Sequence, residues 1–199
     1  MQVFLETERL VLRWLTADDV DNLFELDSDP AVMRFLNGGT ATPRDVIQHE
    51  ILPRFLRSNT RSDGFGVWAA IQKSTADFLG WFSFQPADAD GASAGDATLG
   101  YRLRQAAWGK GYATEGARAL IRKGFTELGV QRVVATTYQD NHASRRVMEK
   151  AGMRLVRRYH MTPEALLAQD TYHSTSLDLW DGDDLEYALE RADWEQRQR

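Results

Sequence analysis

The chain has 199 residues, of which 43% are hydrophobic and 27% charged, a globular composition with enough length to bury a full core. It contains no cysteine, which excludes disulfides, thiolate catalysis and cysteine-based zinc sites. Its net charge of -5 argues against broad nucleic-acid binding, because such binding needs a basic face that displaces counterions.

The first third of the chain predicts one strand followed by helices. Apolar side chains alternate from residue 9 to residue 14, which is the period of a strand. The segment 16–19 has the composition of a capping box, and Asp29-Pro30 begins a second helix that Gly38-Gly39 ends. A third helix is predicted to begin at 42–45, and we expect Pro53 to kink it.

The middle of the chain predicts an antiparallel meander. The runs 65–71 and 78–84 are rich in aromatic and β-branched residues and are separated by a polar turn at 73–75. After a loop rich in Ala, Gly and Asp at 86–96, the run 98–103 predicts the next strand. This pattern differs from the repeated strand-helix alternation of a doubly wound fold.

A glycine loop connects this strand to a helix. Apolar side chains recur at steps of three and four from residue 113 to residue 128, as in an amphipathic helix, and Gly129 suits a left-handed cap. The first N–H groups of a helix have no intrahelical partner, so a phosphate can bind them. Gly109 and Gly111 remove side chains where a ligand approaches the backbone, and Lys110 adds a cation. A plain tight connection is the alternative.

Two common phosphate-binding patterns fail here. A P-loop needs Ser or Thr after its lysine, whereas Gly111 follows Lys110. A dinucleotide-binding loop needs a third glycine where this chain has Thr114. The loop is therefore of another kind.

The last third of the chain predicts alternating strands and helices. A strand at 132–138 precedes a helix that begins at Asn141 and ends at Gly152. Strands follow at 154–160 and 185–189, with Trp194 packed behind the last one. The segment 161–184 is irregular, with a short helix expected at 163–167, and its role cannot be read. Because there is no internal repeat, we expect residues 1–199 to form a single domain.

Two motifs resemble those of one family. The run 108–115 (Trp-Gly-Lys-Gly-Tyr-Ala-Thr-Glu) resembles the acetyl-coenzyme A (acetyl-CoA) loop of the GNAT superfamily of N-acetyltransferases. That loop reads Arg or Gln, two residues, Gly, one residue, then Gly or Ala. Trp108 departs at the first position, but an aromatic residue often stands there in the branch containing the ribosomal-protein alanine N-acetyltransferases. The runs 5–10 and 28–30 also resemble the N-terminal segment of that branch. The run 141–153 resembles the second signature of the superfamily.

The resemblance implies a fold and a cofactor site. The implied fold is α+β (α/β three-layer), with a mixed, mostly antiparallel, splayed sheet flanked by helices. The backbone of Leu103 and Arg104 would hold the pantetheine arm and the acetyl carbonyl, Asn141 would hydrogen-bond the arm, and Ser144 would lie near the sulfur as a general acid. For Asn141 and Ser144, simple helix capping is the alternative. The expected diphosphate ligands are the amides of Gly109, Lys110, Gly111, Tyr112, Ala113 and Thr114.

Acetyl transfer requires a deprotonated amine, a dipole aimed at the developing oxyanion and a proton for the departing thiolate. The candidate catalytic residues are Ser144, His160 and Glu115. Glu115 stands in the first turn of a helix, where a carboxylate also suits an electrostatic or structural role. His142 and relayed water are further candidate bases. The histidines show no paired-ligand spacing, so we expect no metal.

The expected function is transfer of an acetyl group from acetyl-CoA to a primary amine by direct attack in a ternary complex. The acceptor is a protein N-terminus or a small-molecule amine such as a polyamine or an aminoglycoside. A non-catalytic acyl-CoA-binding regulatory domain, or a nucleotide- or nucleic-acid-binding module, remains an alternative. Acidic residues that can attract a cationic amine are Asp88, Asp90, Asp96, Asp181, Asp183 and Asp184.

Localisation and assembly are read from what the sequence lacks and from its strands. No apolar run is as long as a membrane span, and the first residues have no signal-peptide pattern. We therefore expect a cytoplasmic protein with no membrane partner. Exposed edge strands would permit a homodimer.

Overall fold

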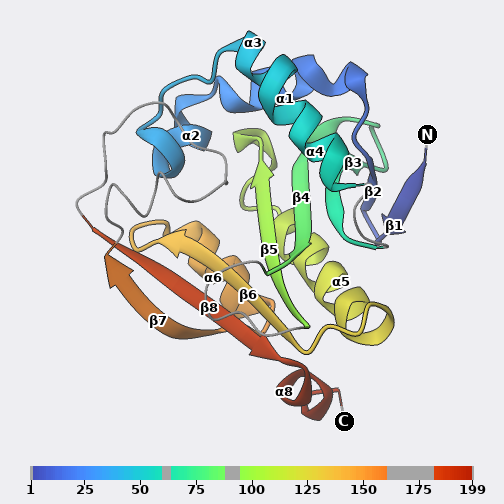
Figure 1. Cartoon of the computed structure of the whole chain (residues 1–199), viewed down its shortest axis with the longest axis vertical. Coiled ribbons are helices and arrows are strands. Elements are labelled where there is room, and N and C mark those ends of the chain that lie inside the picture. Colours follow the sequence, from blue (N-terminus) through green and yellow to red (C-terminus); the bar gives the residue numbers. More distant parts are fainter. Residues whose placement is uncertain (1, 60–63, 88–94, 161–181, 199) are drawn as a thin grey trace.

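The fold is one mixed sheet between two layers of helices (Figure 1). The computed structural model describes residues 2–59, 64–87, 95–160 and 182–198. In these residues the sheet has 8 strands in the order β1-β2-β3-β4-β5-β6-β8-β7. Neighbouring strands are antiparallel except β5 and β6, which are parallel. The expected mixed, mostly antiparallel sheet is confirmed.

The elements have the following bounds. The strands are β1 (Val3–Glu6), β2 (Leu10–Trp14), β3 (Gly66–Gln72), β4 (Phe78–Pro86), β5 (Asp96–Leu103), β6 (Arg132–Tyr138), β7 (Arg154–His160) and β8 (Asp183–Glu190). The helices are α1 (Val20–Asp27), α2 (Pro30–Asn37), α3 (Arg44–Val46), α4 (Leu52–Ser58), α5 (Tyr112–Glu127), α6 (His142–Lys150) and α8 (Arg191–Gln196).

The N-terminal segment is a hairpin, whereas the sequence predicts a single strand. β1 pairs antiparallel with β2 and forms one edge of the sheet. The ring of Phe4 stacks on that of Trp68 with centroids 4.1 Å apart, and this contact holds β1 against the sheet. The prediction is wrong here because β1 has only 4 residues and its packing partner lies far along the chain.

The local signals for the first helices are confirmed. Thr16 and Asp19 form the capping box before α1, and the Asp29 carboxylate caps α2 by accepting from the Ala31 N–H at 2.9 Å. A π turn at Ile47–Ile51 lies immediately before α4 and its Pro53. A proline ring clashes with the carbonyl four residues earlier, and the wider turn relieves that clash.

Each face of the sheet has its own core. Alternate residues of β3 enter the two cores, because side chains along a strand point to opposite faces. Trp68 and Ala70 pack in the core that α5 and α6 cover, whereas Val67 and Ala69 pack in the core under α1 and α4. This is the three-layer arrangement that was expected.

Helix α5 lies very close to the sheet because two of its residues have no side chain. A Cβ at Gly116 would lie 2.3 Å from Phe82 Cζ, and one at Gly124 would lie 2.6 Å from Phe84 Cζ. These glycines share one face of the helix. The close contact fixes α5 against β4, and it thereby fixes the glycine loop that precedes α5.

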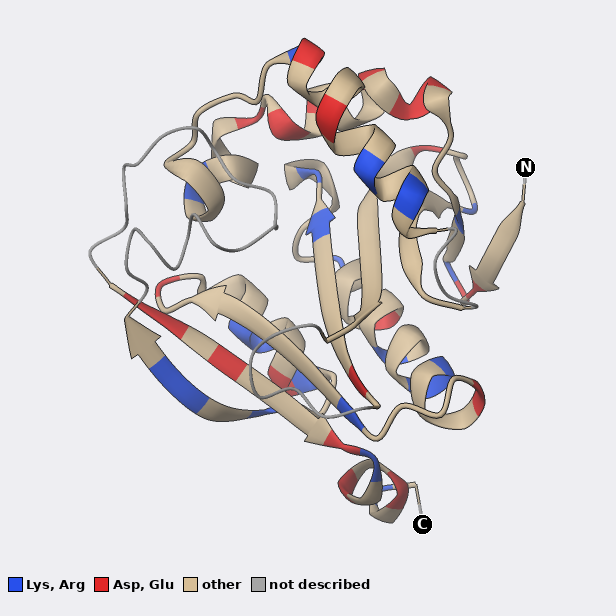
Figure 2. Cartoon of the chain, viewed as in Figure 1, with Lys and Arg blue, Asp and Glu red and all other residues tan. Residues whose placement is uncertain are grey.

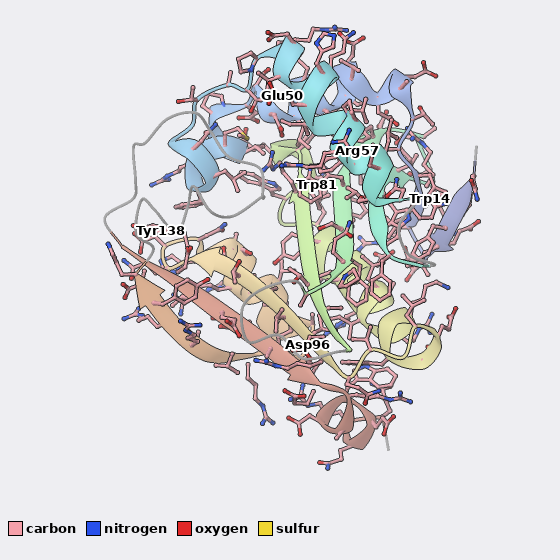
Figure 3. The ribbon with its side chains drawn as sticks, viewed as in Figure 1. Trp14, Glu50, Arg57, Trp81, Asp96 and Tyr138 are labelled. Atoms are coloured by element: carbon pink, nitrogen blue, oxygen red, sulfur yellow. The ribbon has the colours of Figure 1, made fainter. Side chains whose placement is uncertain are left out.

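Strands β5 and β6 pair only at their beginnings. The register runs Asp96↔Arg132, Ala97↔Val133 and Thr98↔Val134 and ends there. Beyond it, β5 continues against β4 and β6 continues against β8. Figure 3 shows Asp96 at the paired end and Tyr138 at the open end. We name the unpaired edges at 99–103 and 135–138 the β5–β6 wedge; the expected splay is confirmed.

The C-terminal elements complete the sheet. Helix α8 places the Trp194 ring 5.5 Å from that of Phe125. Across the described ranges, none of the helices has the length and apolarity that crossing a membrane requires. The helix expected at 163–167 lies outside the described residues, as do Asp88, Asp90 and Asp181.

Candidate active site

The glycine loop between β5 and α5 presents a row of free backbone amides. The first hydrogen bond of the helix runs from Glu115 N–H to the Gly111 carbonyl at 3.0 Å. In the described part of the chain, no protein group accepts from the N–H groups of Gly109, Lys110, Gly111, Tyr112, Ala113 or Thr114. Free N–H groups at a helix start favour an anion. The loop therefore fits a diphosphate.

The loop is exposed and open. Gly109 and Gly111 have φ values of 72° and 85°, in the left-handed region, and a Cβ at Gly109 would meet nothing within 4 Å. The Lys110 ammonium is exposed and has no carboxylate partner among the described residues. Trp108 anchors the near end by donating from Nε1 to the Leu103 carbonyl at 2.8 Å. A ligand can therefore approach both the amides and the ammonium.

Strand β5 directs backbone N–H and C=O groups toward the wedge. Arg104 N–H donates to the Leu79 carbonyl at 2.8 Å, so the residues that bond to β4 are the even-numbered ones. Tyr101 and Leu103 therefore direct their N–H and C=O groups toward the other edge. On that edge, Gln139 N–H donates to β8, so by the same alternation Thr136 of β6 faces β5. As far as the described residues show, donors and acceptors without protein partners thus line the wedge, as an amide-containing arm requires.

The Arg104 backbone has partners within the protein. Its N–H donates to Leu79, and its carbonyl accepts from Ala107 N–H at 2.9 Å, so both groups already have partners. By the same alternation the Leu103 N–H points away from β4 and has no acceptor within the described residues, while its carbonyl accepts from Trp108 Nε1. The Arg104 side chain instead forms an ion pair with Glu25 at 2.9 Å. Of the two residues, only Leu103 retains a backbone donor for a ligand.

Ser144 is hydrogen-bonded across the molecule to Tyr101. The Tyr101 phenol lies 3.0 Å from Ser144 Oγ and 3.1 Å from the Ser144 carbonyl. Asn141 caps α6, because its Oδ1 accepts from Ser144 N–H at 3.1 Å. Burial raises the pKa of Tyr101 to about 12, although the bond with Ser144 opposes this. The two hydroxyls therefore form a neutral pair that joins β5 to α6.

Glu115 is held by the N-terminal hairpin. Its carboxylate accepts from the Thr7 hydroxyl at 2.5 Å, from Arg9 N–H at 2.8 Å and from Arg9 Nε at 2.7 Å. Burial would raise the pKa of this carboxyl, but the bonds from Thr7 and Arg9 outweigh it and hold the pKa below its usual range. A carboxylate with a lowered pKa is a weak base, so this geometry favours a structural role.

His160 lies away from the wedge. It ends β7, the edge strand, and β8 separates that strand from β6. Two strand spacings place β7 roughly 9–10 Å from β6. The His160 side chain is 56% exposed, with Nδ1 3.7 Å from Asp183 Oδ1. His142, the other candidate histidine, is exposed in the first turn of α6. Neither position suits a base for an amine in the wedge.

Two of the acidic residues expected to attract a cation have other roles. Asp96 is buried at the paired end of the wedge, where its Oδ2 lies 3.6 Å from Arg132 Nη1. Asp183 lies 3.4 Å from Arg158 Nε as well as beside His160. Burial, together with the neighbouring Asp183, raises the pKa of Asp184. These residues organise the sheet more than they attract a ligand.

A hollow of about 330 Å³ lies between α1, α2 and the tip of β5. Glu25, Asp29 and Arg104 supply its charged lining. Figure 2 shows acidic residues in the helical layer above the tip of β5. Beneath this layer, the buried pair Arg102–Asp27, with atoms 2.7 Å apart, ties α1 to β5. The hollow is thus held in a fixed position at Arg104, just beyond the end of β5.

Sequence reasoning missed Tyr101, Thr7 and Arg9. Tyr101 reads as an ordinary strand aromatic, and its partner Ser144 is 43 residues away. Thr7 and Arg9 are within the run 5–10 that resembles one family branch. That resemblance indicated the family but gave neither residue a function. A role for the hairpin became apparent only when folding brought it to Glu115.

Comparisons with known proteins agree on one kind of domain. Residues 9–154 match the family described as acetyltransferase (GNAT) domain. The FsC-acetyl coenzyme A-N(2)-transacetylase of Aspergillus fumigatus is 30% identical over 188 residues, which cover 90% of this chain and 78% of that protein. The N-acetyltransferase p20 of Bacillus licheniformis, itself uncharacterized, is 33% identical over 141 residues, covering 70% of this chain and 76% of that one.

Solved structures share the fold. An acetyltransferase of the GNAT family from Bacillus anthracis superposes with a TM-score of 0.73 at 24% identity, covering 96% of this chain and 99% of that chain. The aminoglycoside acetyltransferase AAC(6')-Ib in complex with coenzyme A superposes with a TM-score of 0.69 at 19% identity, covering 96% and 99%. At these identities the likeness concerns the fold alone.

Proposed function

Because this chain belongs to the GNAT family of acetyltransferases and is an acetyl-CoA-dependent N-acetyltransferase, we propose that it transfers the acetyl group directly to a primary amine while both substrates are bound. The observation that carries this proposal is the row of free amides from Gly109 to Thr114 beside the open end of the wedge. When bound, acetyl-CoA supplies an activated thioester. The residues of the chain bind, orient and exchange protons around it.

The glycine loop holds the diphosphate. The free amides at the start of α5 donate to it, and the exposed Lys110 ammonium adds positive charge. The pantetheine arm lies in the β5–β6 wedge, where Leu103 N–H and the backbone of Tyr101 face it. Asn141 donates to the arm from Nδ2, because its Oδ1 is already used at the start of α6. The glycine loop thus binds the diphosphate, and the wedge together with Asn141 binds the pantetheine arm.

Ser144 and Tyr101 act on the sulfur as hydrogen-bond donors and not as acids. The Tyr101 pKa of about 12 lies above the roughly 8.5 that is typical of a thiol. Full transfer of that proton would be unfavourable by about 5 kcal/mol, at 1.36 kcal/mol for each pKa unit. A hydrogen bond from the Ser144 hydroxyl, oriented by Tyr101, stabilises the departing thiolate without that transfer. The proton then comes from the acceptor nitrogen, which becomes cationic when the neutral amine attacks the thioester, or from water.

The amine loses its proton to water and not to a side chain. Glu115 is a weak base bound by Thr7 and Arg9, and His160 lies two strands from the wedge. A relay through water and backbone carbonyls of the wedge needs no titrating side chain. Turnover should therefore follow the fraction of neutral amine and rise with pH through the pKa of the acceptor itself.

The acceptor is a small-molecule amine with more than one positive charge. The hollow has two carboxylates, Glu25 and Asp29, and one guanidinium, Arg104, which pairs with Glu25, so its net charge is negative and attracts cations. Its volume of about 330 Å³ suits a small ligand or part of a larger one. A protein N-terminus is the second candidate, and the resemblance of the N-terminal segment 5–10 supports it.

Thiol release and calorimetry test the function together. Calorimetry measures coenzyme A binding, and a thiol-release assay then follows acetyl-CoA against polyamines, aminoglycosides and peptides with a free N-terminus. We expect micromolar binding, which is the common range for enzymes, and release with at least one cationic amine. A protein that binds coenzyme A without release for any acceptor would be the regulatory acyl-CoA-binding domain. A protein that does not bind coenzyme A would contradict the proposed function.

A further inference from the structure

The N-terminal hairpin contacts the glycine loop through one arginine, Arg9. Arg9 Nη1 donates to the Lys110 carbonyl at 2.9 Å, its Nε donates to Glu115 Oε2 at 2.7 Å, and its Nη2 lies 2.6 Å from the same carboxylate oxygen. The guanidinium also lies over the Tyr112 ring, 4.6 Å from the centroid. One side chain therefore contacts three residues: Lys110 of the loop, and Tyr112 and Glu115 of α5.

The carbonyl that Arg9 binds controls the direction of an amide. The Lys110 carbonyl and the Gly111 N–H belong to one planar trans peptide unit, so they point in opposite directions. Holding the carbonyl toward Arg9 aims the Gly111 N–H away from the hairpin, and in the described residues that N–H has no protein acceptor. The positively charged guanidinium beside the carbonyl oxygen also polarises the peptide unit, which makes the N–H a stronger donor.

The rest of the hairpin fixes Arg9 in this position. Glu115 accepts from the guanidinium, from Arg9 N–H and from the Thr7 hydroxyl, and Lys73 N–H donates to the Arg9 carbonyl at 2.9 Å. Thr7 in turn accepts from Leu10 N–H at 2.9 Å. The loop itself offers little rigidity, because both its glycines are exposed and have left-handed φ values. Rigidity has to come from outside the loop, and Arg9 supplies it.

We propose that Arg9, held by Glu115 and Thr7, is a positioning residue that orients the Lys110–Gly111 peptide unit for the diphosphate of coenzyme A. The proposal rests on the proposed function, since it concerns the same diphosphate site. It also replaces the catalytic role considered for Glu115 with a specific one. Glu115 acts through Arg9 on the affinity for the cofactor and takes no part in proton transfer.

The test compares coenzyme A with pantetheine. Pantetheine has the same arm and thiol but lacks the diphosphate and the 3'-phosphoadenosine attached to it. In calorimetric titrations, Arg9→Met should weaken coenzyme A binding by about tenfold or more, because charge-assisted hydrogen bonds are lost. It should leave pantetheine binding unchanged. Glu115→Gln should have a similar effect on coenzyme A, and the double variant should lose no more than the worse single variant, because both act through one contact.

Matched controls separate positioning from general loss of structure. Glu6→Gln removes the Lys73–Glu6 ion pair, with atoms 2.7 Å apart, from the same hairpin without touching the loop, and it should bind coenzyme A as the native chain does. If Arg9→Met is too unstable to titrate, Arg9→Lys keeps the charge without the forked donors and should still weaken coenzyme A binding selectively.

Each outcome is decisive. Equal weakening of coenzyme A and pantetheine, or native affinity for coenzyme A in both Arg9 variants, would overturn the inference while leaving the proposed function intact. A drop in turnover for Glu115→Gln with both acetyl-CoA and S-acetylpantetheine would restore Glu115 as a base and overturn the inference. Failure of the native chain to bind coenzyme A would overturn the proposed function and the inference with it.

Discussion

Replacing Gly111 with valine separates the ligand role of the loop from ordinary backbone strain. Gly111 has φ 85°, a conformation in which an L residue costs about 1–2 kcal/mol and a β-branched one is a genuine outlier. A Cβ there would lie 3.3 Å from Arg9 Nη2, a tight contact with a side chain that can move. We therefore take about 2 kcal/mol as the cost of keeping the native loop in Gly111→Val.

That cost must be observed in one of two measurements. If the loop stays native, the free energy of unfolding falls by about 2 kcal/mol. If the free protein relaxes the loop instead, coenzyme A has to restore it on binding, and 2 kcal/mol corresponds to a roughly 30-fold weaker affinity. Because the loop is exposed, we expect relaxation, so the loss should be found mainly in the dissociation constant measured by calorimetry.

Gly129→Val is the matched control. Gly129 has φ 72°, and a Cβ there would meet nothing within 4 Å, so the substitution imposes similar strain far from the loop. It should lower the urea midpoint of unfolding and leave coenzyme A affinity unchanged. Native affinity in Gly111→Val without any loss of unfolding free energy, or equal loss of affinity in both variants, would refute the assignment of the loop to the diphosphate.

Three further predictions concern turnover, pH and packing. Tyr101→Phe should keep the fold and lower kcat about tenfold with little change in KM, since Ser144 loses its partner; native kcat in steady-state assays would exclude the hydroxyl pair. Burial would raise the pKa of Asp19, but bonds from Arg13, Thr16 and Asn22 hold it below its usual range. Asp19 therefore stabilises the fold above about pH 4 and loses this contribution as pH falls through its folded pKa. The gap in urea midpoint between the native chain and Asp19→Asn should be full at pH 7 and narrow toward pH 3; a gap independent of pH would contradict this. Gly116→Ala should lower the unfolding free energy by about 1–3 kcal/mol through overlap with Phe82, despite the better helix propensity of alanine, and a higher Tm would refute the packing argument.

The parts of the site that were predictable are those whose chemistry is local. A strand, two glycines around a lysine and an amphipathic helix are contiguous in the sequence, and free amides at a helix start follow from the geometry of any helix. The cap by Asn141 is equally local, since its partner Ser144 N–H is three residues away. The order of elements and the free amides at the start of α5 could therefore be predicted from the sequence, and phosphate binding by 108–115 stays a prediction.

Other features depend on pairing between distant segments. The hairpin strand β1 was missed because its stability comes from Phe4 stacking on Trp68. The Arg104 backbone looked available until the register placed it opposite Leu79. Composition gives no register, and a shift of one residue would have turned every free backbone group of β5 to the other edge.

The sequence by itself determined the local elements: the strands and helices that alternate around 98–160, and the glycine loop at the start of a helix. Only the tertiary structure decided how those elements are used. It opened β5 from β6 after Thr98, brought Tyr101 to Ser144, and placed Arg9 between Lys110 and Glu115. The physical reason is range: a helix start depends on neighbours in the chain, whereas an orienting contact depends on residues that only packing brings together.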